Sequence, residues 1–207
     1  MSAILEFTER PPKEVWLVSR DEPVRKRVLL TRDEEEKIIN SSRYEIVDGE
    51  IRERAMPNPE HARIEAKLSA KLTNFVEESN LGVVYSECHF ELAEKLTRVP
   101  DVAFVSFERF PESGESKGTK WQIAPDLAIE IISPTDDYKD VFEKLDEYFV
   151  AGVKQVWLVE PERKVLTVYY SQTRTTILTE NDELICEAVL PGFRLRLKEI
   201  FQMPKPR

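Results

Sequence analysis

The stretch from Ala124 to Pro134, APDLAIEIISP, constrains the fold more than any other part of the chain. Read as a strand, it places Leu127 and Ile129 on one face, and Asp126 and Glu130 on the other. Both faces are otherwise apolar, which is typical of a central strand buried on both sides. A lone charged carboxylate at Glu130 would cost several kcal/mol in such a place. Glu130 therefore either pairs with a basic residue and serves only the fold, or takes part in a polar site.

The neighbouring sequence predicts the elements around this strand. Helical periodicity favours two helices, and runs of apolar and β-branched residues favour strands. The order is helix, three strands, helix and strand, which predicts an α/β fold with a mixed β-sheet flanked by helices. We expect one domain over residues 1–207, with an N-terminal appendage at 1–30. The predicted elements are a helix at about Glu60–Ser79, strands at Gly82–Leu92, Arg98–Phe107 and Ala124–Ser133, a helix at about Asp140–Ala151, and strands at Gln155–Glu160, Val165–Ser171 and Thr175–Leu178.

A second acid, Asp101, follows Pro100 at the start of the apolar run VPDVAFVS. Alone it is equally well explained as a turn residue that opens a strand. Together with Glu130, it allows another interpretation, because two acids at the ends of neighbouring core strands can converge on one divalent cation. Such hard oxygen ligands favour Mg or Mn over zinc.

A lysine on the second predicted helix is the third candidate. Lys144 falls at the border of the apolar face of that helix, and Tyr148 is its neighbour one turn later. A boundary lysine can also reach water along that face or pair with Asp140. Next to two buried carboxylates, it could orient or deprotonate an attacking water, or balance negative charge that develops on a phosphoryl group.

Composition limits the partners that we expect. The formal net charge of −9 argues against nucleic acid unless positive charge is local or a bound cation neutralises the site. Cys88 and Cys186 have no metal-ligand spacing, so we expect free thiols in a reducing cytosol. No apolar run is long enough to span a bilayer, and no secretory signal is visible. We therefore expect a soluble, cytoplasmic protein without a membrane partner.

An acid on one strand, an acid within a second strand and a lysine form a constellation that resembles the PD-(D/E)XK nuclease superfamily. The chain resembles one branch more closely, the Uma-two family of restriction endonuclease-like proteins. The resemblance covers roughly residues 43–201. Its segments are YEIVDGEI (44–51), PNPEH (57–61), RVPDVAFV (98–105), APDLAIEIISPTDD (124–137), KLDEYFVAGVKQVWLVEP (144–161) and LPGFRLRLKEIF (190–201).

The resemblance implies a restriction-endonuclease-like core and a metal-dependent DNA endonuclease. It makes Asp101 and Glu130 the catalytic acids, which would hold Mg or Mn together with the backbone carbonyl of Ile131. In the standard motif the lysine follows the second acid by two residues, but Ile132 occupies that position here. The branch places its lysine on the next helix, which matches Lys144.

Further residues are accessory candidates, each with a structural alternative. Asp126 shares the face of Glu130, but about 13 Å of strand separates the two, so it shapes the rim of a site or simply opens the strand. His61 lies within the apolar arc of its helix and is equally well explained as a satisfied histidine. Glu65, one turn later, could face the same cleft. Glu45 and Asp48 are assigned to the predicted hairpin turn, although Glu45 also recurs in the pattern of the family that the chain resembles.

Two other functions remain open at this stage. One is a catalytically degenerate nuclease fold that binds nucleic acid or protein. The net negative charge and the displaced lysine are both consistent with it. The other is a metal-dependent hydrolase of some other phosphoester. The N-terminal appendage and an exposed-edge tail also make a homodimer an expectation, by analogy with enzymes that cleave duplexes.

Overall fold

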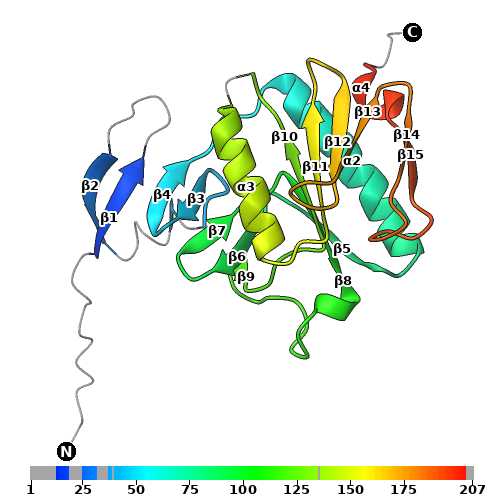
Figure 1. Cartoon of the computed structure of the whole chain (residues 1–207). Helices are drawn as coiled ribbons and strands as arrows, with labels where there is room; N and C mark the ends of the chain where they lie inside the picture. The colour runs from blue at the N-terminus through cyan, green and yellow to red at the C-terminus, as the bar shows by residue number, and fades with distance from the viewer. Residues whose placement is uncertain (1–12, 19–24, 32–36, 39, 135, 204–207) are drawn as a thin grey trace, which may run out of the picture.

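The computed structural model describes residues 13–18, 25–31, 37–38, 40–134 and 136–203 (Figure 1). Strands dominate the described chain, and two long helices, α2 and α3, pack against them. The strands are β1 Lys13–Val18, β2 Arg25–Leu30, β3 Tyr44–Val47, β4 Glu50–Glu53, β5 Gly82–Ser86, β6 His89–Ala93, β7 Leu96–Arg98, β8 Val102–Ser106, β9 Lys120–Trp121, β10 Leu127–Ile131, β11 Gln155–Glu160, β12 Val165–Tyr169, β13 Thr175–Thr179, β14 Glu183–Ile185 and β15 Arg194–Arg196. The helices are α2 Pro59–Glu78, η1 Phe107–Arg109 (a single 3₁₀ turn), α3 Tyr138–Val150 and α4 Lys198–Phe201.

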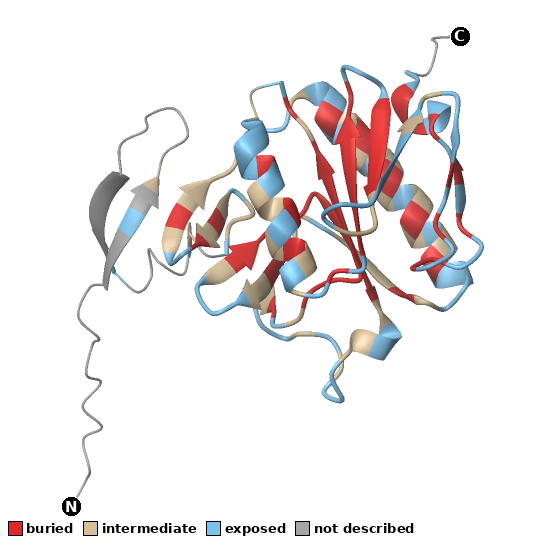
Figure 2. Ribbon diagram, viewed as in Figure 1, coloured by how far each residue is buried: buried red, intermediate tan, exposed pale blue. Residues whose placement is uncertain are grey.

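The core sheet has six strands in the order β13-β12-β11-β10-β8-β5. Strands β10 and β11 run parallel, whereas the other neighbours are antiparallel, so the sheet is mixed as predicted. All five residues of β10 are buried, because α2 covers one face of the sheet and α3 the other (Figures 1 and 2). The predicted central strand is confirmed.

Helix α2 forms for the reasons that the sequence suggests. The side chain of Asn58 caps its first turn by accepting from the backbone N–H of His61, and Pro59 occupies the first position. Leu68, Leu72 and other residues of one stripe are fully buried against the core sheet. Each such leucine contributes roughly 1.5–3 kcal/mol through burial.

Helix α3 covers the opposite face of the core sheet. The side chain of Asp137 caps its first turn, and Gly152, with φ +88°, follows its end in the left-handed conformation that glycine favours. Leu145 and Tyr148 are buried against Ala128 and its neighbours. The helix therefore presents its buried face to the same side of β10 that carries Glu130.

A second sheet of seven strands, in the order β2-β1-β4-β3-β7-β6-β9, lies beside the core sheet (Figure 1). The expectation of unbroken strands at Gly82–Leu92 and Arg98–Phe107 is wrong, because the chain changes sheet within each. The first break lies at Glu87, which has φ 49°, and the second at Pro100, which has no N–H to donate to a ladder. Both halves of each run have strand-like composition, so composition alone hides the breaks.

The N-terminal residues 1–30 fall only partly within the described chain. Strands β1 and β2 form an antiparallel hairpin, and β1 extends the seven-stranded sheet by pairing in parallel with β4. Residues 1–12 and 19–24 lie outside the described residues. Among the described helices, none has the length and apolar character needed to cross a membrane. The expected single domain over 1–207 stays a prediction.

Candidate active site

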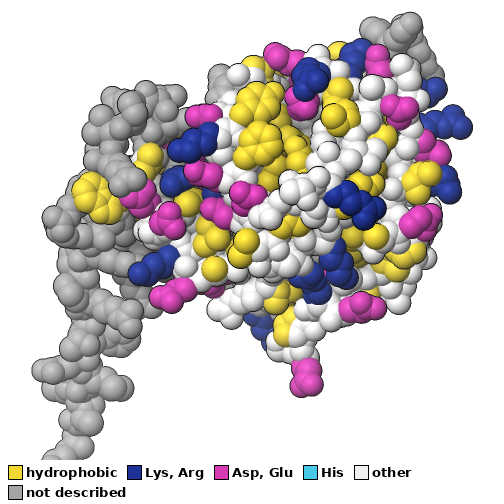
Figure 3. Space-filling view, viewed as in Figure 1, with side chains coloured by type: hydrophobic (Ala, Val, Ile, Leu, Met, Phe, Trp, Pro, Cys, Tyr) yellow, Lys and Arg dark blue, Asp and Glu magenta, His cyan; other side chains and the backbone are white. Residues whose placement is uncertain are grey.

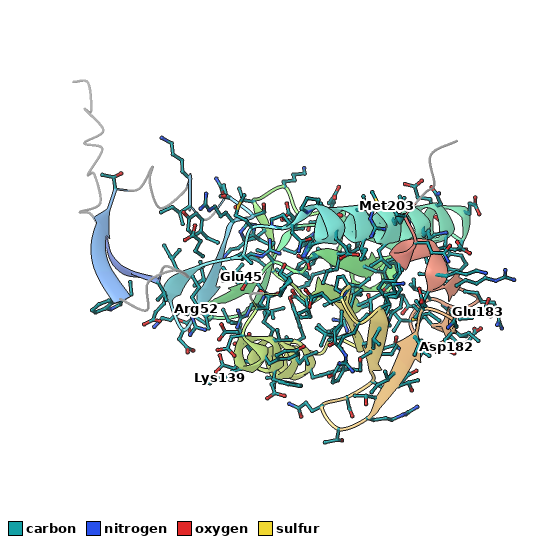
Figure 4. All side chains as sticks on the ribbon, turned by 90° about the horizontal axis from the view of Figure 1, so that it is seen from above. Glu45, Arg52, Lys139, Asp182, Glu183 and Met203 are labelled. Carbon is teal, nitrogen blue, oxygen red and sulfur yellow. The ribbon has the colours of Figure 1, made fainter. Side chains whose placement is uncertain are left out.

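A pocket of about 180 Å³ opens where the two sheets meet α3. Strands β3 and β4 form one wall, Asp101 and the end of β10 form the floor, and the first half of α3 forms the other wall. Figure 4 shows Glu45 and Arg52 on one side, across from the helix that carries Lys139. Six lining residues carry the argument that follows: Glu45, Arg54, His61, Asp101, Glu130 and Lys144.

Asp101 lies in the segment that joins β7 in one sheet to β8 in the other. It is 3% exposed, and each of its carboxylate oxygens has a donor. The Arg54 Nη2 lies 2.7 Å from Oδ1, and the backbone N–H of Ile131 donates to Oδ2 at 2.7 Å. Burial raises the pKa of Asp101, but its hydrogen bond with His61 and the Arg54 charge outweigh burial and lower it.

Glu130 points from β10 into the same pocket and is 8% exposed. The Tyr148 hydroxyl donates to Oε1 at 2.6 Å, and the Lys144 Nζ lies 3.4 Å from Oε2. Burial raises the pKa of Glu130, and although Lys144 opposes this, the Asp101 charge adds to the rise. The floor of the pocket thus holds two neighbouring buried acids with different environments.

Lys144 reaches the pocket from α3 and contacts two acids rather than one. Its Nζ lies 3.0 Å from Glu45 Oε1 as well as 3.4 Å from Glu130 Oε2. Burial lowers the pKa of Lys144, but the charges of Glu130 and Glu45 raise it further than burial lowers it. Lys144 is therefore a cation at neutral pH. This charge state favours the role of balancing negative charge over that of deprotonating water.

Glu45 belongs to the site, although the sequence analysis assigned it to the hairpin turn. We expected it to serve the hairpin turn, but it is 4% exposed and lines the pocket. Arg98 Nη1 donates to it at 2.8 Å, and the backbone N–H of Val99 at 3.1 Å. Although burial raises its pKa, Lys144, Arg98 and Arg54 hold the pKa of Glu45 at about 2. The available signal was that Glu45 shares one face of β3 with Val47, the apolar residue two positions later, which is also buried.

Arg54 and Arg98 are the basic residues that sequence analysis missed. Arg54 lies just after β4 and also reaches Glu87, whose Oε1 is 3.6 Å from Nη1. Arg98 is 3% exposed and joins Glu45 to Glu147 of α3. No single segment reveals their partners. Arg98 meets Glu45 across neighbouring strands of the seven-stranded sheet and Glu147 from α3. Arg54 reaches Asp101 where the chain passes between the two sheets. A buried arginine beside buried acids marks a charge cluster that no single segment reveals.

His61 and Glu65, the accessory candidates on α2, behave differently. His61 lines the pocket, with Nε2 3.4 Å from Asp101 Oδ1, and its buried Nδ1 has no partner. Burial lowers the pKa of His61, but the hydrogen bond to Asp101, together with the charges of Asp101 and Glu65, raises it overall. Glu65 does not line the pocket itself, yet burial and the charges of Asp101 and Glu87 raise its pKa to about 6.

The structure does not bring Asp126 to the pocket, and the expectation that it shapes the rim is wrong. It lies just before β10, at the opposite end from Glu130. The backbone N–H of Ser106 donates to it at 2.8 Å, and Arg109 and Lys154 bind the same carboxylate at 2.9 and 2.8 Å. Asp126 therefore ties β8 and the start of β11 to β10.

The donor set fits a divalent cation only in part. Among the described residues, no three or more His, Cys, Asp or Glu side chains cluster in a way that could hold a metal. Asp101 and Glu130 offer two carboxylates, and Mg²⁺ in proteins is often held by one or two carboxylates, with water and phosphate oxygens completing the shell. Burial and, to a smaller extent, the Asp101 charge raise the pKa of Glu130, and a cation bound beside the two acids would offset both effects.

Comparison with known proteins identifies a family that this chain matches. The family model "Uma2: Putative restriction endonuclease" matches residues 32–198. Among solved structures, the chain is similar to a "putative nuclease belonging to DUF820" from Anabaena variabilis, with a TM-score of 0.70 and 24% identity over 83% of this chain and 97% of that chain. That likeness confirms the restriction-endonuclease-like fold. No curated protein matches the chain. Because the family match spans most of its length, the chain belongs to the Uma2 family.

Proposed function

We propose that the chain is a divalent-metal-dependent endonuclease that hydrolyses phosphodiester bonds of DNA. The observation that carries the proposal is the convergence of Asp101, Glu130 and Lys144 in one pocket, although three separate elements deliver them. Asp101 and Glu130 are the residues that would hold Mg²⁺ or Mn²⁺, with the Ile131 carbonyl as a further ligand. Such an ion lowers the pKa of a bound water and polarises a phosphoryl group.

The chain's own residues define the rest of the chemistry. Tyr148 fixes the orientation of Glu130 through a hydrogen bond from its hydroxyl. Lys144 remains positively charged and supplies local charge for a phosphoryl group whose negative charge grows in the transition state. Arg54 and His61 add positive charge or hydrogen-bond donors next to Asp101. Acids outnumber lysines and arginines in the pocket lining, so under this proposal the bound divalent cation offsets the net charge of −9 at the site.

The test is a plasmid-nicking assay with Mg²⁺ or Mn²⁺ on wild type and on Asp101→Asn and Glu130→Gln. We expect each variant to lose at least about 100-fold in rate while its thermal unfolding remains cooperative. The matched control is Glu160→Gln, because Glu160 is a buried acid at the same end of the neighbouring strand but lies outside the pocket. Unchanged nicking by either pocket variant would refute the proposal.

One observation favours a second candidate, a non-catalytic module that binds nucleic acid or protein. Arg54 already neutralises Asp101, so the acids do not require a metal for charge balance. Calorimetric titration with Mn²⁺ separates the two functions. Heat that disappears in Asp101→Asn and Glu130→Gln, but persists in Glu160→Gln, supports the nuclease. An absence of heat in wild type supports the non-catalytic module.

A further inference from the structure

The two oxygens of Asp101 differ in how much room they leave for a cation. A carboxylate offers about four acceptor positions, two on each oxygen. Oδ1 has two partners, because Arg54 Nη2 lies 2.7 Å away and His61 Nε2 lies 3.4 Å away. Oδ2 accepts one hydrogen bond, from the backbone N–H of Ile131 at 2.7 Å. Within the described chain, Oδ1 is therefore fully engaged, whereas Oδ2 keeps one acceptor position.

His61 contacts Oδ1 as a hydrogen-bond donor. Its Nδ1 is buried and has no hydrogen-bond partner among the described residues. In a neutral imidazole one ring nitrogen carries the proton and the other is an acceptor. A buried N–H without an acceptor is costly, so the proton belongs on Nε2, which faces the Asp101 carboxylate. The unpartnered Nδ1 thus agrees with a hydrogen bond from His61 to Asp101.

Arg54 is held beside Asp101 by several other groups. Its side chain is only 12% exposed. Nη1 donates to the backbone carbonyl of Ser42 at 2.8 Å and lies 3.6 Å from Glu87 Oε1. Nε lies 4.0 Å from Glu45 Oε1. Because a guanidinium is not deprotonated in proteins, Arg54 is a permanent cation, and contacts beyond Asp101 fix its position.

The second acid of the pocket floor also has a cation of the chain beside it. The Tyr148 hydroxyl donates to Glu130 Oε1 at 2.6 Å, and Lys144 Nζ lies 3.4 Å from Oε2. Lys144 is held in turn by Glu45, whose Oε1 lies 3.0 Å from Nζ. Each oxygen of Glu130 has one such partner, so Glu130 keeps acceptor positions that Asp101 Oδ1 lacks.

Given the metal-dependent function proposed above, we infer that the pocket holds one divalent cation, and that the Arg54 guanidinium occupies the place of a second ion beside Asp101. Ions in two-metal sites lie about 3.5–4 Å apart. A carboxylate that bridges such a pair offers one oxygen to each ion. Asp101 cannot do this, because its Oδ1 is engaged by Arg54 and His61. Its Oδ2 and Glu130 remain available to a single ion.

Arg54 supplies part of what a second ion would supply. The two ions of a two-metal site stabilise the attacking and the leaving oxygen of a phosphoryl group. A guanidinium offers a positive charge together with N–H donors whose geometry matches phosphate oxygens. It carries no water of lowered pKa, so that contribution comes from the single ion alone. The inference therefore describes a one-metal site in which an arginine provides the second positive charge.

Acids are also paired with the chain's own cations at the mouth of the pocket. Arg52 of β4 and Lys139 of α3 each lie 3.8 Å from a carboxylate oxygen of Glu143. Figure 3 shows acidic and basic side chains mixed together near β4 and α3. No described group of three or more acid, histidine or cysteine side chains could hold an ion by itself. The mouth of the pocket therefore adds no second metal site.

The test counts the Mn²⁺ ions bound to the full chain, by titration followed by electron paramagnetic resonance. We expect wild type to saturate at one ion. Arg54→Met removes the charge and frees Oδ1 of Asp101 next to Glu87, so it should bind a second ion. The two ions, about 3.5–4 Å apart, would couple magnetically and change the spectrum. Arg52→Met removes a positive charge from the same wall of the pocket, without a contact to Asp101, and is the matched control that should stay at one ion.

The outcomes separate this inference from the proposed function. Two ions in wild type would overturn the inference but leave a metal-dependent nuclease standing. An equal number of ions in wild type and in Arg54→Met would overturn it as well. A wild type that binds no ion would contradict the proposed metal dependence. A gain of one ion in Arg54→Met would even then support Arg54 as the occupant of a cation's place.

A second measurement on wild type covers the case in which Arg54→Met does not fold. The guanidinium protons of Arg54 are followed by NMR while Mg²⁺ is added to saturation. Their exchange with water should stay slow, because the ion that binds does not displace Arg54 from Asp101. Loss of this protection on addition of Mg²⁺ would overturn the inference, since the ion would then have taken the place of the arginine.

Discussion

The buried acids of this chain differ in what neutralises them. Asp126 is neutralised by two basic side chains and a backbone N–H at the far end of β10. Glu45 is neutralised by Arg98, Lys144 and Val99. Glu130 receives the weakest compensation and is the only one of the three whose pKa is raised. A buried carboxylate whose negative charge is only weakly compensated, and which lines a pocket, is typical of a site where the charge state changes during function.

Glu45→Gln tests the structural side of this charge cluster. The substitution leaves Arg98 and Lys144 with less compensating charge in a buried place, so we expect a loss of about 3–5 kcal/mol in the free energy of unfolding. Urea denaturation measures it. Glu53→Gln, on the same hairpin, removes a partner of the half-exposed Arg43 and should cost less than about 1 kcal/mol. Equal losses in the two variants would contradict the cluster as described.

Asp126→Asn should destabilise the protein in a pH-dependent way. The pKa of Asp126 is lowered because Lys154, Ser106 and Arg109 outweigh burial. A lowered folded-state pKa gives stability that is present above the unfolded value of 3.8 and is lost as pH falls through the folded value. We expect a difference on the order of 2 kcal/mol at neutral pH. It should shrink below about pH 4, as followed by urea denaturation across pH. A difference that does not change with pH would contradict the assigned ion pairs.

At the residue scale, sequence analysis identified the two carboxylates and Lys144 but not the two arginines. Glu130 was identifiable because an acid inside an apolar strand is conspicuous, and Asp101 because an acid at the start of a neighbouring strand could converge with it. Lys144 was identifiable from its place at the border of an apolar helix face. Arg54 and Arg98 were not, because their surroundings depend on which strands become neighbours and on where α3 packs. Sequence periodicity indicates on which face of its own helix or strand a side chain lies, but not which residues of another element it will contact.

At the element scale, the chain was most predictable where one pattern ran uninterrupted. Helix α2 begins and ends within one residue of the prediction, and β11 matches it at both ends. Two predicted strands, at Gly82–Leu92 and Arg98–Phe107, proved to be four, because periodicity does not report a change of sheet. The second of these breaks places Asp101 between the sheets. The error in the fold and the position of the site therefore have the same origin.

Gly82→Ala tests how tightly β5 and β8 pair. An added Cβ would lie 2.1 Å from the carbonyl oxygen of Val105, which is backbone and cannot rotate away. We expect a loss of at least about 2 kcal/mol in the free energy of unfolding, measured by thermal denaturation. Gly118→Ala is the control, because its nearest neighbour would lie at 3.7 Å. Wild-type stability in Gly82→Ala would show that the strands are further apart than described.

At the scale of the whole molecule, negative charge dominates, and the pocket shares this balance, because eight of its lining residues are acids and four are lysine or arginine. The net charge of −9 opposes long-range attraction of DNA, whereas Arg54, Arg98 and Lys144 lie in the pocket. Binding of DNA should therefore depend on a divalent cation more than on the protein surface. This balance could be read from composition only in part, because composition does not say where the charges lie.

Fluorescence anisotropy with a labelled duplex tests this charge balance. With Lys144→Met, which retains both carboxylates, we expect binding to strengthen at least about tenfold when Mg²⁺ replaces EDTA. The dependence of affinity on monovalent salt should be shallow, because few surface phosphate contacts form. Tight binding in EDTA with a steep salt dependence would contradict this dependence on the cation, because it would require a basic surface for the phosphates.

The two walls of the pocket come from different sheets, and this division has a consequence for partial unfolding. If strands β3 and β4 fray while the core sheet persists, Asp101 and Glu130 keep their places but lose Arg54 and Glu45. The exposed acids would then take up protons or ions from solution. A divalent ion in solution would thus stabilise the frayed form, because it would take the place of Arg54 beside Asp101.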